Sequence, residues 1–377
     1  MSGANSPSLL PVTDLVRHLA SHGLPSRALA VTSLGVSQAD WPMFLRSCEQ
    51  HRLLGLLGEA VRAGYLVVTP DQRRSLEAEL TRWLGHALVV ERELVRCGAV
   101  LGNHGIDFRI LKGAALANTL YADPSLRVFA DVDLLVPSSG FSAASEVLCA
   151  DRQARRVLPE LRAGFDDRFG REILLRRESV EIDLHRTLVD GPYGLRVLEA
   201  DLFGAALDVA LGGQVVPALG PTARFLHTCF AVCLGDWPPR LMVQRDLAEM
   251  LVEGPLAGRL DADEVLEMAR RWRATSVVGL AIRLTIHALD FECDHPLVGW
   301  ARRERPGPLD RLMLVSYRGR ARGYTSQALS VLAIRGWRNR WDYTRAVVRP
   351  SRDYLAARGF RRGDRLRRAL GLGPSAR

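Results

Sequence analysis

Residues 110–137 read ILKGAALANTLYADPSLRVFADVDLLVP, and this stretch decides the fold. Two segments in and beside it, 107–111 and 128–136, have the apolar and β-branched composition of strands. A helical segment, 114–121, lies between them, after a lysine–glycine pair and before a proline turn. Strand, glycine turn, helix and strand in this order predict a small mixed sheet covered by helices on one side, which is an α+β fold.

Two acidic residues lie in the second of these strands. Asp131 and Asp133 are two positions apart, so their carboxylates share one face of the strand while Val132 and Leu134 share the other. Two like charges this close raise each other's pKa unless a cation lies between them. A divalent metal ion is the simplest cation to expect there.

A second acidic strand follows at residues 180–185, VEIDLH, which with residues 172–176 predicts a short hairpin. Its alternation places Glu181, Asp183 and His185 on one face. If this strand neighbours the first, Asp183 or Glu181 completes a cluster of three carboxylates, whose oxygens suit Mg²⁺ or Mn²⁺. His185 is open to two interpretations, as a general base or as a hydrogen-bonding residue that orients its neighbour.

The charge composition singles out Lys112. The chain of 377 residues has 51 Lys and Arg against 42 Asp and Glu, a net charge of +9, and Lys112 is its single lysine. An ammonium group is a compact point charge, whereas guanidinium is a planar fork. Lys112 lies where a strand turns into a helix, and the free backbone N–H groups at the start of a helix favour anions. Gly113 allows the backbone to approach a bound ligand closely. This turn predicts a phosphate-binding site.

The remaining sequence predicts helical sections around this core. We expect an N-terminal helical section over residues 1–68, the core with a long helix over 69–190, a second helical section over 191–345 and a basic tail over 346–377. Thr69 and Pro70 predict the start of the long helix. The other expected elements are helices near residues 41–65, 141–149, 195–207, 221–235, 241–251, 263–289 and 319–335, and a short strand at 212–216.

Composition excludes several classes of protein. A hydrophobic fraction of 47% excludes a disordered chain, and six cysteines are too few for a disulfide scaffold. Cys229 and Cys233 are favoured as buried thiols over a metal-binding pair. The sequence has no apolar run long enough for a membrane span, and its first residues lack the regions of a signal peptide, so we expect a cytoplasmic protein.

The quoted stretch, followed by VEIDLH, resembles the nucleotidyltransferase-like family of the DNA polymerase β superfamily, with a Leu-Lys-Gly motif where most relatives have Gly-Ser. Residues 224–251 and 349–360 resemble the later helical segment and the C-terminal stretch of these proteins. The resemblance implies a mixed sheet of the polymerase β type between helical sections. It also implies metal-dependent transfer of a nucleotidyl or phosphoryl group from an NTP. Members are often encoded with peptide natural-product genes, so the implied acceptor is a hydroxyl of a small molecule or peptide.

The resemblance also implies roles for single residues. Asp131 and Asp133 would bind both metal ions, Mg²⁺ or Mn²⁺, and Asp183 would complete the first metal site and orient or deprotonate the acceptor hydroxyl. Lys112 and Gly113 would hold the triphosphate of the NTP, with ATP as the expected donor.

Other cationic residues leave alternatives open. Arg127, four positions before Asp131, is a candidate for neutralising phosphate charge. Arg245 and Asp246 either line an acceptor pocket or, as we favour, form an ion pair or packing contact.

The alternative function is a non-catalytic nucleotide- or RNA-binding protein. Arginines at 358, 361, 362, 365, 367 and 368 raise the question of a nucleic-acid partner, but the scarcity of aromatic residues among them favours a solvated tail.

Overall fold

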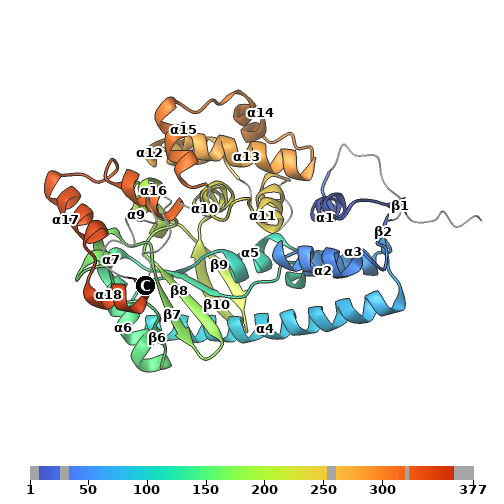
Figure 1. The fold of residues 1–377 in the computed structure, drawn as a ribbon, viewed down its shortest axis with the longest axis horizontal. Coiled ribbons are helices and arrows are strands. Elements are labelled where there is room, and N and C mark those ends of the chain that lie inside the picture. Colours follow the sequence, from blue (N-terminus) through green and yellow to red (C-terminus); the bar gives the residue numbers. More distant parts are fainter. Residues whose placement is uncertain (1–7, 26–33, 253–259, 319–321, 361–377) are drawn as a thin grey trace, which may run out of the picture.

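A mixed sheet forms the centre of the computed structural model, which describes residues 8–25, 34–252, 260–318 and 322–360 (Figure 1). Within these residues the sheet has seven strands in the order β6-β7-β8-β5-β4-β10-β9. The strands are β4 (Arg109–Ile110), β5 (Val132–Leu135), β6 (Arg155–Arg156), β7 (Glu172–Arg177), β8 (Val180–His185), β9 (Ala206–Leu211) and β10 (Gln214–Leu219). Three two-residue strands, β1 (Ser8–Leu9), β2 (Leu34–Gly35) and β3 (Leu66–Val67), form a separate parallel sheet.

The register of the central strands brings the two acidic segments together. β5 runs parallel to β8, with Asp133 opposite Asp183. The hairpin expected from residues 172–185 is confirmed, since β7 and β8 pair antiparallel. Val132 and Leu134 are fully buried, because their face of β5 packs into the core of the sheet.

A second hairpin extends the sheet beyond residue 190, where we expected the core to end. The helix expected over 195–207 is wrong: a short helix, α9 (Glu199–Phe203), is followed by β9 and β10, which pair antiparallel. Gly212 and Gly213 both have positive φ and form the two-residue turn that such a hairpin requires. β10 then pairs with β4, so the sheet recruits strands from both sides of the expected boundary.

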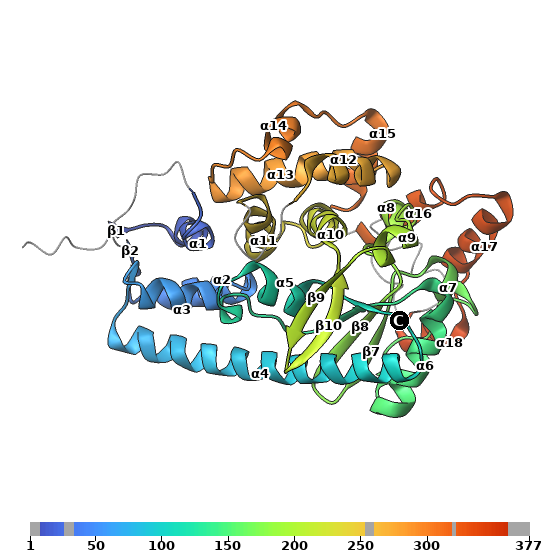
Figure 2. The ribbon, with the colours of Figure 1, turned by 180° about the vertical axis from the view of Figure 1, so that it is seen from behind.

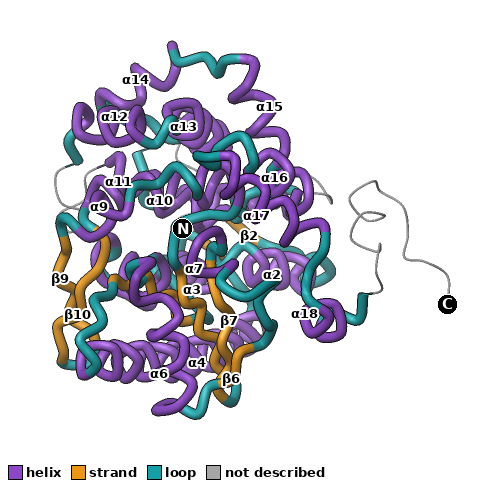
Figure 3. Tube along the Cα trace, turned by 90° about the vertical axis from the view of Figure 1, so that its left-hand side faces the viewer, coloured by secondary structure: helices purple, strands orange, loops and turns teal. Residues whose placement is uncertain are grey.

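Helix α4 (Pro70–Asn103) packs along one face of the sheet (Figures 1 and 2). Its predicted start is confirmed, because Thr69 caps the helix and Gln72 completes a capping box. Helix α6 (Phe141–Arg152) lies on the same side of the sheet, while the helices from α10 (Pro221–Leu234) to α15 (Pro308–Ser316) lie on the other side, as Figure 3 shows. The sheet is therefore covered on both faces, which corrects the expectation of helices on one side.

Two of the expected long helices are each divided by a residue with positive φ. The segment 41–65 forms α2 (Trp41–Gln50) and α3 (Leu54–Arg62), with Arg52 between them at φ 62°. The segment 263–289 forms α12 (Ala262–Arg271) and α13 (Thr275–Leu289), with Arg273 between them. A left-handed residue cannot continue a right-handed helix, and the hydrophobic pattern alone does not reveal it.

The remaining helices lie in the core, in the two helical sections and in the C-terminal segment. They are α1 (Val12–Ser21), α5 (Lys112–Leu120), α7 (Phe165–Phe169), α8 (Gly191–Gly194), α10 (Pro221–Leu234), α11 (Leu241–Val252), α14 (Pro296–Arg303), α15 (Pro308–Ser316), α16 (Arg322–Ser330), α17 (Trp337–Val348) and α18 (Arg352–Ala357). Short 3-10 turns occur at Pro124–Leu126 and Ser138–Gly140. The tail arginines from residue 361 onward lie outside the described residues. No helix in the described part of the chain is long and apolar enough to cross a membrane, and the cytoplasmic location stays a prediction.

Candidate active site

Three polar side chains converge where β5 and β8 run side by side. Asp133, Asp183 and His185 each place one ligand atom within 4.8 Å of the others. The Nε2 atom of His185 lies 2.9 Å from Oδ1 of Asp133. Asp133 is 4% exposed and His185 only 1% exposed, so these two side chains are shielded from bulk water, whereas Asp183 is partly exposed.

The environment shifts the three pKa values in different directions. Burial raises the pKa of Asp133, but the Lys112 ammonium and the hydrogen bond from His185 outweigh it and hold this pKa well below its usual range. Burial, followed by the charges of Asp133 and Asp131, raises the pKa of Asp183 to about 7. Burial lowers the pKa of His185 to about 4. At neutral pH, therefore, Asp133 is ionised and His185 is neutral, with its Nε2–H donating to Asp133.

The ligand atoms of Asp133, Asp183 and His185 fit a divalent cation. The pKa of Asp183 rises partly because Asp133 and Asp131 already concentrate negative charge nearby. Carboxylate oxygens suit Mg²⁺ and Mn²⁺, and an imidazole nitrogen is an acceptable ligand for the softer Mn²⁺. Of the two candidates on β8, Asp183 joins the group, whereas Glu181 is exposed and pairs with Arg176.

Asp131 lies just before β5, outside this close group. It is half-buried and lines a cavity together with Asp133. The structure thus brings Asp133 and Asp183 into one group, adds His185 to it and leaves Asp131 beside it on the cavity wall. The assignment of all three aspartates as metal ligands stays a prediction.

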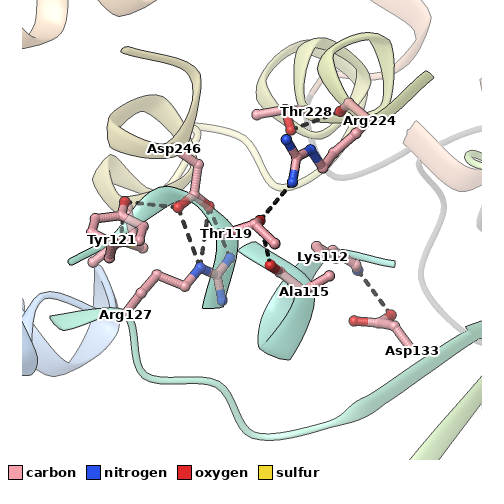
Figure 4. Close-up of polar contacts among 10 residues, drawn as sticks. Lys112, Ala115, Thr119, Tyr121, Arg127, Asp133, Arg224, Thr228 and Asp246 are labelled. Carbon is pink, nitrogen blue, oxygen red and sulfur yellow. Dashed lines mark hydrogen bonds and ion pairs between the residues drawn. The ribbon is translucent and has the colours of Figure 1, made fainter. Parts of the chain in front are cut away.

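The lysine–glycine turn reaches the same place from β4. Lys112 begins α5, and its Nζ atom lies 3.2 Å from Oδ1 of Asp133, as Figure 4 shows. The Lys112 side chain is 36% exposed and so retains access to the cavity. Gly113 has φ 47° and ψ −114°, a conformation that glycine adopts far more readily than residues with a side chain. The turn therefore depends on glycine at this position.

Arg127 does not present a free charge to the cavity. Its guanidinium is buried against Asp246 of α11, with Nη2 2.9 Å from Oδ2, and the hydroxyl of Tyr121 donates to the same carboxylate (Figure 4). Arg245 forms an ion pair with Glu249, four positions along the helix. Both contacts agree with the favoured expectation that residues 245 and 246 serve packing, although Asp246 acts between segments and not within its helix.

A second contact fixes α10 above α5. Arg224 donates from Nη1 to Oγ1 of Thr119 at 2.5 Å, and Thr119 donates to the carbonyl of Ala115 (Figure 4). His227, on the same helix as Arg224, is buried; burial, then the charge of Lys112, lowers its pKa to about 3. α10 thus places a neutral imidazole beside the lysine turn.

A cavity of about 340 Å³ opens in front of these groups. Its lining comes from the sheet, from both helical sections and from the lysine turn, and its charged members are Arg52, Lys112, Arg127, Asp131, Asp133, Arg171, Asp190, Asp236 and Arg240. Sequence reasoning missed Arg52, Arg171 and Arg240, because arginine is so frequent in this chain that no local signal distinguishes them. The chemistry that this arrangement supports is the binding of a polyanion beside a cation site.

Comparisons with known proteins place this geometry in context. No curated protein matches the sequence. Among solved structures, the chain is similar to the antibiotic-resistance factor ANT(2'')-Ia, at 15% identity over 52% of this chain and 96% of that chain, with a TM-score of 0.33. It is also similar to an antigenic nucleotidyltransferase-like protein from Paracoccidioides brasiliensis, at 17% identity over 55% of this chain and 94% of that chain, with a TM-score of 0.31. Both TM-scores are low, so neither likeness informs the activity of this chain.

The family comparison is more extensive. A family model described as uncharacterised nucleotidyltransferase matches residues 37–290, which is more than half of the chain. The matched region includes the lysine turn, β5, β8 and the helices α10 and α11 that close the cavity. The chain therefore belongs to this family of uncharacterised nucleotidyltransferases.

Proposed function

We propose that the chain transfers a nucleotidyl group from an NTP, with ATP as the expected donor, to a hydroxyl of a small molecule or peptide. Mg²⁺ or Mn²⁺ would be held by Asp131, Asp133 and Asp183, in the manner of the DNA polymerase β superfamily. The observation that carries this proposal is the group Asp133, Asp183 and His185 beside a cavity lined by arginines and the lone lysine. Membership of a nucleotidyltransferase family supports it.

Each residue of the site has a role in this reaction. The acceptor oxygen attacks the α-phosphorus of the NTP, and the bond to the leaving pyrophosphate breaks. Asp183, whose pKa is about 7 in the metal-free chain, is assigned to accept the hydroxyl proton. A bound divalent cation would stabilise the negative charge on the attacking and leaving oxygens. Lys112 and the backbone beside Gly113 would bind phosphate oxygens.

His185 is better suited to positioning than to proton transfer. Its burial lowers its pKa to about 4, so it is a weak base, and its Nε2–H donates to Asp133. A hydrogen bond of this kind fixes the orientation of a ligating carboxylate. We therefore assign His185 to the orientation of Asp133.

A product assay tests the proposed function. The purified chain is incubated with Mg²⁺, each of the four NTPs and a panel of hydroxyl acceptors, and products are weighed by mass spectrometry. A mass gain of one nucleotide is expected; a gain of one phosphate would identify phosphoryl transfer instead. Asp133→Asn should abolish product, whereas Glu181→Gln, which changes an exposed carboxylate on the strand of Asp183, should not. No product from the wild type, or full activity in Asp133→Asn, would falsify the proposal.

A second candidate is a non-catalytic RNA-binding protein. It is favoured by Trp337 and Trp341, which are 74% and 64% exposed and four positions apart on α17. Arg338 lies over the Trp337 ring, and Arg340 lies beside Trp341 in a shallow hollow. Exposed aromatic rings among arginines suit single-stranded nucleic acid. Fluorescence anisotropy with single-stranded RNA tests this: binding lost in the double variant Trp337→Ala/Trp341→Ala, without any transfer product, would favour this candidate over the enzyme.

A further inference from the structure

Arg52 has a strained backbone at the edge of the cavity. It lies between α2 and α3 with φ 62°, a left-handed conformation that costs a residue with a side chain about 1–2 kcal/mol. Glycine would adopt it freely. The conformation ends α2, because the backbone N–H of Arg52 donates to the carbonyl of Glu49 and that of Leu53 to the carbonyl of Cys48.

Two contacts hold the turn around Arg52 in place. On one side of Arg52, His51 Nδ1 accepts from the backbone N–H of Leu241 at 3.2 Å, and its carbonyl accepts from Met242 at 3.3 Å. On the other side, Gly55 lies so close to the turn before Arg127 that a Cβ there would be 2.2 Å from the carbonyl oxygen of Ser125. The α2–α3 turn is therefore fixed to α11 and to the segment that leads into β5.

The side chain of Arg52 is directed into the cavity. It is partly buried, it lines the cavity with Lys112 and Asp131, and its guanidinium carbon lies 5.5 Å from the centre of the Trp83 ring. Burial lowers its pKa from the usual value, and the charge of Asp131 only partly offsets this. A guanidinium in such a place remains charged and favours an anion close by.

The other arginines of the cavity already have carboxylate partners. Arg127 pairs with Asp246, Arg240 with Asp236 and Arg171 with Glu172. Lys112 is engaged with Asp133. Among the residues that the structure describes, no carboxylate lies within ion-pair distance of Arg52, so its charge can meet a ligand without breaking an ion pair.

From these observations we propose that Arg52 binds the triphosphate of the NTP donor. The planar guanidinium suits two phosphate oxygens at once, which the ammonium of Lys112 does not. The N-terminal helical section thereby completes the binding site and is more than a scaffold for it. The identity of the ligand rests on the proposed function, whereas the preference for an anionic group rests on the contacts of Arg52.

Binding of magnesium tripolyphosphate tests this proposal without any turnover. Calorimetric titration is carried out on the wild type and on Arg52→Gly, in which the glycine relieves the strain, so a melting temperature at or above that of the wild type is expected. We expect the Kd for tripolyphosphate to rise about tenfold to a hundredfold in Arg52→Gly. Arg52→Lys, which keeps the charge without the planar fork, should give a smaller rise. Arg46→Gln removes an exposed arginine from α2 and should leave the Kd unchanged.

The outcomes separate this proposal from the proposed function. An unchanged Kd in both Arg52 variants, or no binding of tripolyphosphate by the wild type, overturns the role of Arg52 even if the wild type transfers nucleotides. A raised Kd in Arg52→Gly together with no product from any NTP supports the role of Arg52 and contradicts the proposed function. If Arg52→Gly melts below the wild type, the Kd values of Arg52→Lys and Arg46→Gln for tripolyphosphate are compared instead. A higher Kd in Arg52→Lys supports the role of Arg52, and equal Kd values overturn it.

Discussion

Asp133 connects more of the site than any other single side chain described above. It accepts a hydrogen bond from His185 and pairs with Lys112, and both partners lower its pKa. Strand alternation predicted the position of Asp133, and the lysine count drew attention to Lys112. The role of His185 was left open by the sequence, because only burial and a bonding partner distinguish a base from an orienting residue.

If His185 orients Asp133, removal of the His185 side chain should weaken metal binding. We expect His185→Ala to raise the Kd for Mn²⁺ by about 10- to 100-fold. His185→Gln, which retains a hydrogen-bond donor, should recover part of this loss. Binding is measured by paramagnetic relaxation of water protons in Mn²⁺ titrations. Identical losses in the two variants would argue against a positioning role.

Asp183 should make the stability of the metal-free chain depend on pH. Its pKa is about 7 in the folded chain and about 3.9 when unfolded, so between these values the folded state binds more protons. Its contribution to the free energy of unfolding is therefore fully present below about pH 4 and is lost as the pH rises through about 7. Asp183→Asn, which mimics the protonated acid, should melt a few degrees above the wild type at pH 8 but not at pH 4.

Thermal unfolding in EDTA from pH 4 to 8.5 measures this effect. His185 and His227 have lowered pKa values, of about 4 and about 3. In part of this range their contribution to the free energy of unfolding therefore rises with pH, opposite to that of Asp183. The quantity to compare is thus the difference between wild type and Asp183→Asn at each pH. Asp208→Asn, an exposed carboxylate on β9, serves as the control. A difference that does not change with pH would show that Asp183 titrates normally.

Among the elements, the lysine turn and the second hairpin show what local sequence can and cannot predict. The turn at Gly113 was predicted as an interruption between strand and helix, and the structure confirms it with a positive φ. The β9–β10 hairpin was missed in part, because a strand was expected only at 212–216 and residues 206 and 207 were assigned to the end of a helix. Pairing with β10 makes residues 206–211 a strand, and β10 in turn pairs with β4, more than a hundred residues earlier in the sequence.

The conformation of Gly113 leads to a prediction for the turn. Gly113→Ala should destabilise the chain by about 1–3 kcal/mol, because alanine is strained at φ 47° and ψ −114°. It should also weaken tripolyphosphate binding, since the backbone near Lys112 shifts. Gly85→Ala, at an exposed helical position of α4 with no atom close to the added Cβ, should instead stabilise by about 0.5–1 kcal/mol. Urea denaturation measures both, and equal effects of the two substitutions would contradict this account.

Across the whole molecule, the site exists because three sections meet at one cavity. The sheet supplies the carboxylates, the α2–α3 turn supplies Arg52, and α10 and α11 close the opposite side. The expected boundary at residue 190 divides the sheet, since β9 and β10 follow it, while the boundaries at residues 68 and 345 stay predictions. The buried pair of Arg127 and Asp246 links the segment before β5 to α11.

This buried pair should matter most when only one partner is removed. Asp246→Ala leaves the Arg127 guanidinium buried without its carboxylate and should cost about 3–5 kcal/mol of stability. The double variant Arg127→Met/Asp246→Leu removes both charges and should recover much of that loss. A double-mutant cycle in urea measures the coupling. Additive losses would mean that the two residues contribute independently and do not join the sections.

The sequence by itself determined the local elements of the site: the lysine–glycine turn, the alternating aspartates of β5, the acidic hairpin and the capped start of α4. These follow from side-chain periodicity and backbone preference within a few residues, which a sequence displays directly. Only the tertiary structure decided that Asp183 and not Glu181 joins Asp133, that Asp246 neutralises Arg127, and that Arg52 enters the cavity. Those outcomes depend on strand register and on packing between sections that are distant in the chain. There, burial and the loss of hydrogen bonds to water set the energies.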